Sequence, residues 1–580
     1  MDRNAIAIVL EEIGALLEIQ GENRFKAMAF RNAARALAQL EPDLSAVLAV
    51  GVLESIAGIG PATASVIREL AGTGGSRYYD QLVSQTPPGL LELLSVSQLG
   101  PSRIRTLHVE LGIASLDDLE RAARQGRIAR LRGYGAKTEA RILAGVADVR
   151  GRAGRRRYAE VVELAERLCG FVESLRGVER AEPAGEYRRG CETVGGMELV
   201  ARLAAGADRV AVADRFLALP GLQRAQREAH RVEASFGDGF RVVLWLADGP
   251  AHATTLLIAT GPAEHVAELR GLAADRGLGL EAPGLSEGDR RIEVEDESAI
   301  YRVFGLGWVA PELRDSTDAV RAAASGALPR LVDYEDLQGC FHCHTRYSDG
   351  RATVEEMAEA ALGRGWRYLG IADHSQFAAY AGGLSPDEIL EQHADIDAWN
   401  ARSGPRLWVF KGIEADILPD GRLDYEDRPD LLARFDYVIA SIHSAFGLPR
   451  DEQTRRVLRA LRNPHVTFLG HATGRQLLAR RGCDLDLDAV MRAMAQRGQS
   501  IEINSDPWRM ELDWRHWPRA KALGIRAAIN PDAHSVSDLD YVRNGIVIAR
   551  KGWLAAADVV NCWSLERVHS FFGASRSSAD

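Results

Sequence analysis

The sequence predicts a multidomain protein with a helical N-terminal region, a central α/β region and a C-terminal parallel barrel. Short amphipathic helices fill residues 1–150, strands alternate with helices from 160 to 325, and strands separated by helices recur seven times after residue 335. A chain of 580 residues is also far longer than one hydrophobic core usually supports. We therefore expect three or more domains.

Composition places the chain among globular proteins. It is 46% hydrophobic and 26% charged, which gives no case for wholesale disorder or a fibre. Glu11 and Glu12 interrupt the N-terminal apolar run, so it does not resemble a signal peptide, and no segment approaches the roughly 18 apolar residues that span a bilayer. Six cysteines are too sparse for a disulfide framework. We expect a cytoplasmic protein, a monomer, with no membrane partner.

Three similar pieces in the helical region indicate DNA-backbone binding. They are IAGIGPATASVI (56–67), VSQLGPSRIRTL (96–107) and LRGYGAKTEARIL (131–143), and each has a glycine turn that enters a helix. Amides at a helix N-terminus suit a phosphate oxygen and read no base. One copy would be ordinary turn chemistry, but three resemble helix-hairpin-helix units. The candidate DNA-binding residues are Gly58, Gly60, Gly100, Arg103, Gly133, Gly135 and Lys137.

The charge pattern agrees with this interpretation of the helical region. The whole chain has a net charge of -10, but residues 101–160 carry fourteen Lys or Arg against seven Asp or Glu. A locally basic segment favours a polyanionic partner, whereas a solvated helix face followed by a linker is the plain alternative.

The central region reads as an α/β or α+β domain. RVVLWLA (241–247) and TTLLIAT (254–260) are strand-like, and AEHVAELRGLAADRG (263–277) is typical of a helix that ends at glycine. The Ser/Ala/Gly-rich piece RAAASGALPR (321–330) is typical of a linker.

Seven predicted strands follow residue 335, and polar groups collect where they end. The strands lie in CFHCHT, YLGIADHS, WVFKGIEADI, YVIASIHS, VTFLGHAT, SIEINSD and IRAAINPDAHS. Active sites of parallel barrels lie at the carboxyl ends of the strands. One such histidine is usually structural, but nine imidazole and carboxylate groups at these ends indicate a metal site for Zn, Mn or Fe. The candidate metal ligands are His342, His344, Asp349, His374, Glu414, His443, His471, Asp532 and His534.

Two cysteines lie among these histidines. Cys340 and Cys343 form a C-x-x-C, but alternation along a strand sends them to opposite faces. We therefore expect that they do not share one ion.

The nine positions resemble the PHP (polymerase and histidinol phosphatase) superfamily, whose trinuclear metal site hydrolyses phosphoesters in a distorted seven-stranded barrel. The resemblance implies one metal on His342, His344, Glu414 and Asp532, a second on Asp349, His374 and His534, and a third on His443 and His471, with Glu414 bridging. Position 340 is a cysteine in this chain, whereas the family commonly has an aspartate there. Clustered ions would generate hydroxide near neutral pH, which makes phosphodiesters the natural substrates.

Four residues are candidates for direct catalytic roles in the barrel. Asp532 and His534 are the last two candidate ligands along the chain. Arg475 and Arg509 could each bind a phosphate through two guanidinium N–H groups. Surface or interdomain ion pairs are the alternative role of the two arginines.

The rest of the chain resembles bacterial family X DNA polymerases that carry a C-terminal PHP domain. LLEIQGENRFKAMAFRNAARAL and VAPELRD (309–315) resemble that family's signatures. The resemblance implies a nucleotidyltransferase-like palm and thumb between the helical region and the barrel. The expected domains are a helix-hairpin-helix domain (1–85), a finger-like helix-hairpin-helix segment (86–155), a palm (156–260), a thumb-like domain (261–325), a linker (326–335) and a PHP domain (336–580).

The palm departs from the family at the polymerase site. Family members carry two aspartates in the loop equivalent to GEYRRGCETVGGMELV (185–200) and a third on a nearby strand, whereas this chain has Gly196, Glu198 and Val243 there. Polymerase chemistry needs these carboxylates to hold two magnesium ions. Where the family has a serine that meets nucleotide phosphates, this chain has Glu186. The family's lysine of the first hairpin falls at about the position of Val66. The polymerase site is therefore expected to be degenerate.

The sequence thus predicts a metal-dependent DNA phosphoesterase, a 3'-5' exonuclease with 3'-end cleaning or abasic-site incision as related activities. Its cofactor would be a trinuclear cluster of Mn or Zn, with Fe as a further choice, and its partner would be gapped duplex or a 3' end. Three alternatives stay open: an active gap-filling polymerase, a small-molecule phosphatase of the histidinol-phosphate type, and a non-catalytic DNA-binding scaffold.

Overall fold

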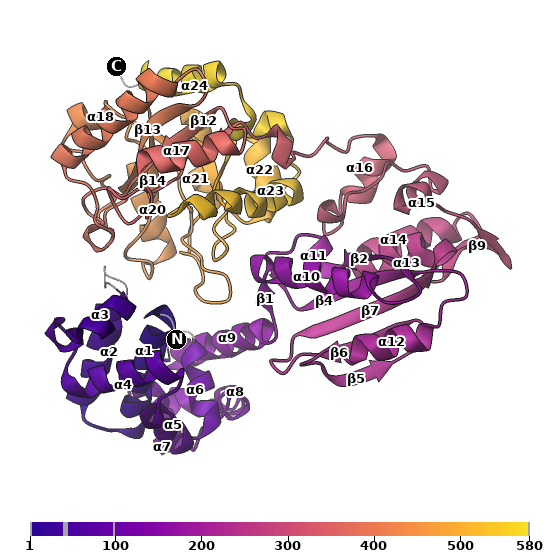
Figure 1. The fold of residues 1–580 in the computed structure, drawn as a ribbon, viewed down its shortest axis with the longest axis horizontal. Helices are drawn as coiled ribbons and strands as arrows, with labels where there is room; N and C mark the ends of the chain where they lie inside the picture. The colour runs from indigo at the N-terminus through magenta and orange to yellow at the C-terminus, as the bar shows by residue number, and fades with distance from the viewer. Residues whose placement is uncertain (1–2, 39–43, 97–98, 578–580) are drawn as a thin grey trace. The chain divides into compact units, whose positions relative to one another are not determined.

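The computed structural model describes residues 3–38, 44–96 and 99–577. By its internal contacts the chain divides into two compact units, residues 1–153 and 154–580. Each unit is described by itself (Figure 1).

The first unit is entirely helical in its described part. Two apolar clusters form its core, one built from residues between Ile6 and Leu82, the other from Ile19 and residues between Leu90 and Val149. The helices are α1 (Arg3–Gln20), α2 (Arg24–Ala38), α3 (Leu44–Val50), α4 (Pro61–Thr73), α5 (Arg77–Ser84), α6 (Pro88–Glu92), α7 (Pro101–Leu111), α8 (Leu116–Arg124) and α9 (Ala136–Arg152).

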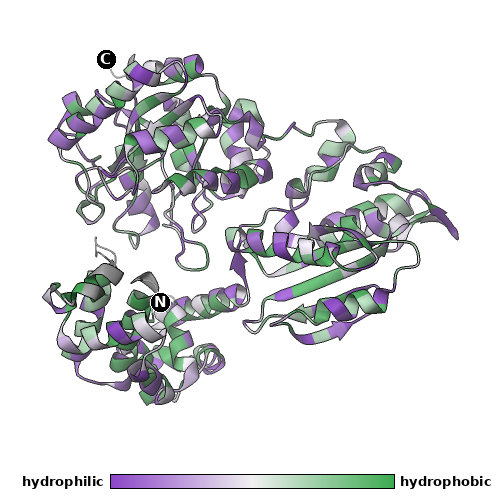
Figure 2. Ribbon diagram, viewed as in Figure 1, coloured by the Kyte–Doolittle hydropathy of each residue, from purple (hydrophilic) through white to green (hydrophobic). Residues whose placement is uncertain are grey.

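The second unit begins with a five-stranded sheet in the order β2-β4-β7-β6-β5. Strands β4 and β7 are parallel and the other pairs are antiparallel. The hydrophobic run of β7 is visible as a mostly green strand (Figure 2), which confirms the predicted strand in RVVLWLA. The strands are β2 (Val178–Ala184), β4 (Gly196–Leu203), β5 (Gln223–Arg227), β6 (Arg231–Ser235) and β7 (Arg241–Asp248).

Helices cover both faces of this sheet. Met197 and Leu199 on one face of β4 pack with α10 (Tyr158–Glu173) and α12 (Arg209–Leu217), while Val200 on the other face packs with α13 (His252–Thr260). The short pair β1 (Arg156–Arg157) and β3 (Thr193–Val194) and the helix α11 (Gly185–Arg188) complete this part.

Two expectations about the central region are wrong. TTLLIAT, expected to be a strand, lies in α13, because an apolar run that is buried on nearly every side has no period to distinguish helix from strand. RAAASGALPR, expected to be a linker, begins inside α16 (Ala319–Ser325), which ends at Gly326 in the left-handed region.

The thumb-like part contains helices and a small sheet. The predicted helix after residue 263 is confirmed as α14 (Ala263–Ala274). The other elements are β8 (Leu278–Glu281), β9 (Gly284–Glu287), β10 (Arg290–Ile292) and α15 (Glu297–Val303).

Seven parallel strands in sequential order confirm the predicted barrel. Its ends meet where His344 N donates to Ala533 O (2.8 Å) and Ala533 N donates to His342 O (3.2 Å). The strands are β11 (Gly339–Cys340), β12 (Tyr368–Ile371), β13 (Trp408–Asp416), β14 (Tyr437–Ser441), β15 (Val466–Leu469), β16 (Ser500–Asn504) and β17 (Ala527–Asn530).

An aromatic cluster fills the barrel interior and includes Phe341, Phe410, Tyr437 and Phe468, together with Phe572 of α24. This cluster leaves the carboxyl ends of the strands for polar groups. The barrel helices are α17 (Val354–Gly363), α18 (Pro386–Ser403), α19 (Pro429–Leu432), α20 (Arg450–Ala460), α21 (Leu487–Arg497), α22 (Trp517–Ala522), α23 (Val542–Lys551) and α24 (Leu565–Ser577).

Candidate metal centre

The parallel topology gathers the predicted ligands at the carboxyl ends of the barrel strands. Three groups of side chains have donor atoms within 4.8 Å of one another. These groups are His344, Asp349, His374 and His534; His342, His344 and Glu414; and His374, Glu414 and His443. His344, His374 and Glu414 each fall into two of these groups.

Pairing beyond the regular strands brings the first and last ligands together. Cys343 forms a parallel bridge with Ala533, so His342 and His344 on one segment lie beside Asp532 and His534 on the other. His344 Nε2 lies 3.1 Å from Asp532 Oδ1. Asp532 has a φ of 54°, a conformation that costs energy in a residue with a side chain and that clusters at functional sites.

Glu414 lies at the middle of the cluster. Its Oε1 atom is 2.8 Å from His471 Nε2 and 3.2 Å from His443 Nε2. Its Oε2 atom is 2.9 Å from His374 Nδ1 and 3.4 Å from His342 Nε2. A parallel bridge between His374 and Glu414 sets this arrangement. His344 Nε2 lies 3.7 Å from the same Oε2 atom, so five imidazoles converge on one buried carboxylate.

The donor set fits divalent metal ions. Within the described residues, the buried atoms His342 Nε2, His344 Nδ1, His374 Nδ1 and Glu414 Oε2 lie near other polar atoms but form no well-aligned hydrogen bond. Buried polar atoms without partners are costly, and coordination to a metal ion would satisfy them. Mixed imidazole and carboxylate donors suit Zn, Mn or Fe.

Burial and charge shift the pKa values in opposite directions within the cluster. Burial, with the neighbouring His534 and His374, lowers the pKa of His344 to about 3. Burial also disfavours charge on His443, but Glu414 and Asp416 outweigh it and raise its pKa to about 10. The carboxylates therefore favour positive charge at the centre, which is what bound metal ions would supply.

Sequence reasoning missed two carboxylates behind the ligands. Glu502 Oε1 lies 2.6 Å from His342 Nδ1, and Asp416 Oδ1 lies 3.1 Å from His443 Nδ1. Such partners fix the tautomer and orientation of a ligating histidine. A signal for Asp416 existed, because it follows Glu414 by two residues in β13 and so points to the same face.

The cysteines do not point to opposite faces as expected, while the expectation that they share no ion stays a prediction. Cys340 Sγ and Cys343 Sγ lie 3.6 Å apart and both are buried. Strand β11 ends at Cys340, so alternation does not continue to Cys343. Neither sulfur belongs to the candidate metal groups.

The two predicted phosphate-binding arginines have different surroundings. Arg475 donates from Nε to Arg509 O (3.0 Å) and pairs with Asp513 (3.3 Å) and Glu192 (3.4 Å), which matches its interdomain alternative. Arg509 Nε lies 3.7 Å from Asp532 Oδ2, so its guanidinium stands at the metal centre.

In the palm, two of the residues predicted to depart from the family, Glu198 and Val243, lie directly opposite each other on neighbouring strands. Glu198 of β4 and Glu233 of β6 both pair in register with Val243 of β7. Arg241 lies between the two glutamates, 3.9 Å from Glu198 and 3.5 Å from Glu233, and pairs in register with Gly196. A cavity of about 540 Å³ adjoins Glu198 and Arg241.

Other residues that bear on the polymerase resemblance make structural contacts. Arg188 pairs with Glu297, and Arg189 pairs with Asp315 at 3.1 Å. Glu186 accepts a hydrogen bond from Gly195 N (2.7 Å). Val66 is buried in the core of the first unit.

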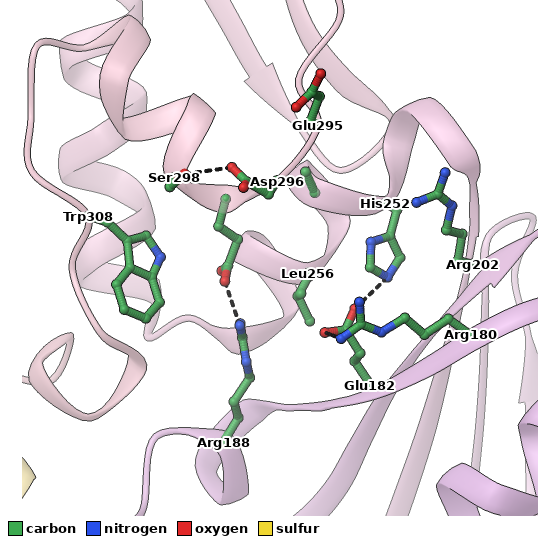
Figure 3. Close-up of a pocket in the computed structure, with 12 residues that line it drawn as sticks. Arg180, Glu182, Arg188, Arg202, His252, Leu256, Glu295, Asp296, Ser298 and Trp308 are labelled. Carbon is green, nitrogen blue, oxygen red and sulfur yellow. Dashed lines mark hydrogen bonds and ion pairs between the residues drawn. The ribbon is translucent and has the colours of Figure 1, made fainter. Parts of the chain in front are cut away.

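A second cavity, of about 250 Å³, lies between palm and thumb (Figure 3). His252 Nε2 lies 3.1 Å from Glu182, and Arg188 reaches Glu297 across it. These charged groups largely neutralise one another, and no candidate metal ligand lines this cavity.

The predicted DNA-binding residues lie at three helix starts. Gly60, Gly100 and Gly135 immediately precede α4, α7 and α9. Gly58 and Gly133 have positive φ values of 95° and 86°, which a residue with a side chain rarely adopts. Arg103 and Lys137 lie in the first turns of α7 and α9.

Four family models match the chain. They are a helix-hairpin-helix domain (residues 1–76), a SAM-like helix-hairpin-helix tandem (90–148), a DNA polymerase beta thumb (255–315) and a PHP domain (341–505). Among the described residues, no helix combines the length and the apolar content needed to cross a membrane.

Two relatives show how far these similarities extend. The "DNA polymerase/3'-5' exonuclease PolX" of Bacillus subtilis is 33% identical over 576 residues, which cover 98% of this chain and 99% of the relative. A "Probable phosphatase" of Acetivibrio thermocellus is 30% identical over 203 residues, which cover 33% of this chain and 78% of the relative. The similarity to the first relative thus spans all the domains.

Proposed function

This chain belongs to the family of the DNA polymerase/3'-5' exonuclease PolX, and we propose that it acts as a metal-dependent 3'-5' exonuclease and 3'-end processing enzyme in DNA repair. The observation that carries this proposal is the contrast between its two sites. The barrel gathers nine imidazole and carboxylate groups, seven of which fall into candidate metal groups, whereas in the palm the Arg241 side chain lies between two glutamates.

The barrel residues have distinct tasks in this proposal. His342, His344, Glu414 and the other donors would hold two or three divalent ions, Mn or Zn, with Fe as a further choice. When bound, such ions lower the pKa of water and neutralise a phosphodiester. Arg509 is placed to hold a phosphate oxygen near Asp532. Glu502 would orient His342, and Asp416 would orient His443.

The palm is proposed to bind DNA without polymerising it. Two-metal nucleotidyl transfer needs carboxylates that share the ions, and Val243 occupies the position between Glu198 and Glu233 in the sheet. The Arg241 guanidinium offsets the charges of Glu198 and Glu233 and would repel a metal ion. A gap-filling polymerase, which the family name favours, is the second candidate.

The helix-hairpin-helix units are proposed to hold the DNA backbone. Each offers helix N-terminal amides next to a glycine turn, and Arg103 and Lys137 add positive charge. Such contacts are independent of sequence, and the DNA partner proposed here is gapped duplex or a 3' end. They also argue against a small-molecule phosphatase, since the relative named a probable phosphatase matches only 33% of this chain.

A cleavage assay with manganese tests this proposal. Labelled single-stranded, gapped and blunt DNA and histidinol phosphate would be offered to the full chain. We expect stepwise loss of 3' nucleotides from DNA and binding that weakens steeply with salt. Hydrolysis of histidinol phosphate without cleavage of any DNA would contradict the proposal and favour the phosphatase.

A further inference from the structure

The loop between β12 and α18 exposes two aromatic side chains beside the candidate metal centre. Phe377 is 46% exposed and Tyr380 is 63% exposed. By contrast, seven large aromatic residues of the barrel are buried in its interior cluster. Exposed aromatic rings next to a catalytic centre are candidates for contact with a substrate.

Tyr380 lies against two of the candidate ligands. Its ring centroid is 6.3 Å from that of His374 and 6.4 Å from that of His443. The ring meets His443 nearly edge to face, at an interplanar angle of 74°. Tyr380 therefore lies at the rim of the candidate metal cluster. Part of its ring contacts the ligands, and much of the ring remains accessible to solvent.

Hydrogen bonds hold the backbone of this loop. Phe377 N donates to Asp424 Oδ2 (2.7 Å), and Gln376 N donates to Tyr425 Oη (3.0 Å). Leu384 N donates to His374 O (2.9 Å) and so closes the loop at a ligand. The ring is thus presented from an ordered backbone, which lowers the entropy cost of binding.

Trp508 provides a contrast on another loop of the barrel. It is also about half exposed, at 49%, but the guanidinium of Arg157 lies 3.2 Å from its ring centroid. One face of that ring is therefore already covered. Tyr380 has no such cation over its ring among the contacts of the described residues.

We infer that Tyr380 is the residue that stacks on an unpaired nucleobase next to the scissile phosphate. This inference rests on the proposed function, since a phosphodiester at the metal centre places the adjoining nucleotides at its rim. Every base has a π face, so stacking on an aromatic ring is independent of sequence. A base within a duplex has both faces covered, so Tyr380 selects frayed or single-stranded 3' ends.

The test removes the base rather than the phosphate. A single-stranded oligonucleotide is compared with copies that carry a base-free tetrahydrofuran nucleotide at the terminal or penultimate position, in manganese. We expect the native chain to lose about ten-fold in kcat/KM without the critical base, the scale of one lost stack. On the normal substrate, Tyr380→Leu should have a kcat/KM about ten-fold below that of the native chain. Removal of the base should lower the kcat/KM of this variant by less than about two-fold further.

Two further variants and a binding readout sharpen the test. Tyr380→Phe keeps the ring and should behave as the native chain, whereas a loss equal to that of Tyr380→Leu would assign the effect to the hydroxyl and overturn the inference. Trp308→Leu removes an exposed aromatic of the thumb (44% exposed) and should leave the base effect intact. Fluorescence of 2-aminopurine near the 3' end, measured with calcium, should be quenched by the native chain and not by Tyr380→Leu.

A base-free diester separates the possible failures. Bis(p-nitrophenyl) phosphate reports phosphodiester cleavage by the native chain without any base. If the native chain cleaves both this diester and the oligonucleotide, but base removal costs the native chain and Tyr380→Leu equally, only the stacking role is overturned. If it cleaves neither, the proposed function falls and the stacking role falls with it.

Discussion

Glu502 and His342 form a fully buried pair beneath the metal centre, with Glu502 Oε1 2.6 Å from His342 Nδ1. Asn504 and Asn530 donate further hydrogen bonds to Glu502 (3.1 and 3.0 Å), so the carboxylate is held in place. Burial opposes its ionisation, but His342 outweighs this effect and lowers the pKa of Glu502. An ionised Glu502 accepts a hydrogen bond from the Nδ1–H of His342, which leaves Nε2 of His342 to bind a metal ion.

Removing this carboxylate should weaken metal binding. In Glu502→Gln the orientation of His342 is less well fixed, and we expect metal affinity to fall by about 10- to 100-fold. Titration calorimetry of the metal-free chain with Mn2+ or Zn2+ measures this directly. Glu359→Gln, the same change at an exposed site on α17, is the matched control. Equal affinities in the two variants would show that Glu502 does not orient a ligand.

Arg509 and Arg475 should separate in function. Arg509 lies beside Asp532, so Arg509→Ala should lower kcat by about 100-fold through loss of a phosphate contact. Arg475 is bound to Asp513, Glu192 and backbone oxygens, so Arg475→Ala should lower thermal stability and change kcat far less. Single-turnover cleavage and thermal melting measure the two effects. A large loss of kcat in Arg475→Ala with little change in Arg509→Ala would show that Arg475, and not Arg509, contacts the phosphate.

Restoring carboxylates to the palm should restore polymerase chemistry if metal ligands are what it lacks. We expect no primer extension by the native chain. The combined variant Gly196→Asp, Glu198→Asp, Val243→Asp and Arg241→Ser should extend a primer in gapped duplex with Mg2+, because it supplies three carboxylates and removes the competing guanidinium.

The matched control for this variant carries asparagine at the three carboxylate positions and should not extend the primer. Extension by the unmodified chain that disappears in Glu198→Ala would contradict the account of the palm, because Glu198 would then support catalysis.

Asp315 should make stability depend on acid pH. It pairs with Arg189 at 3.1 Å and with the buried Lys551 of α23, and so joins palm, thumb and barrel. Burial alone would raise its pKa, but Lys551 and Arg189 outweigh burial and lower the pKa below its ordinary value of 3.8. A lowered folded-state pKa stabilises the fold above the unfolded pKa, and this stability is lost as pH falls through the folded pKa.

Melting curves over pH test this linkage. Asp315→Asn should lower the free energy of unfolding by about 3 kcal/mol near neutral pH, because it leaves Lys551 buried without its partner. The difference from the native chain should shrink as pH falls below about 4. A difference that stays constant with pH would mean that the Asp315 charge does not contribute.

The sequence predicted the barrel because each strand is a short apolar run, and six of the seven are followed by or end in a candidate ligand. Parallel topology then determines that the ends meet, so His374 and Glu414 could be grouped without coordinates. The helix α13 could not be predicted in this way. A segment that is buried on nearly every side shows neither the hydrophobic period of a helix nor that of a strand. The Cys340 and Cys343 contact was missed because β11 ends early.

Contacts between distant segments were the main source of the remaining errors. Arg475 pairs with Glu192, 283 residues earlier, and Glu502 meets His342 across the barrel. Neither partner has a local signature. Tyr380 likewise could not be singled out from the sequence, because only the structure shows that its ring lies beside His374 and His443.

One gel assay tests the central claim that the chemistry lies in the barrel. A 5'-labelled primer in gapped duplex is incubated with manganese, with and without nucleotides, and the native chain is compared with His342→Ala/His344→Ala. We predict that the native chain shortens the primer and that shortening disappears in the double variant. Lengthening of the primer that persists in the double variant would contradict the claim, because it would show a polymerase at work in the palm.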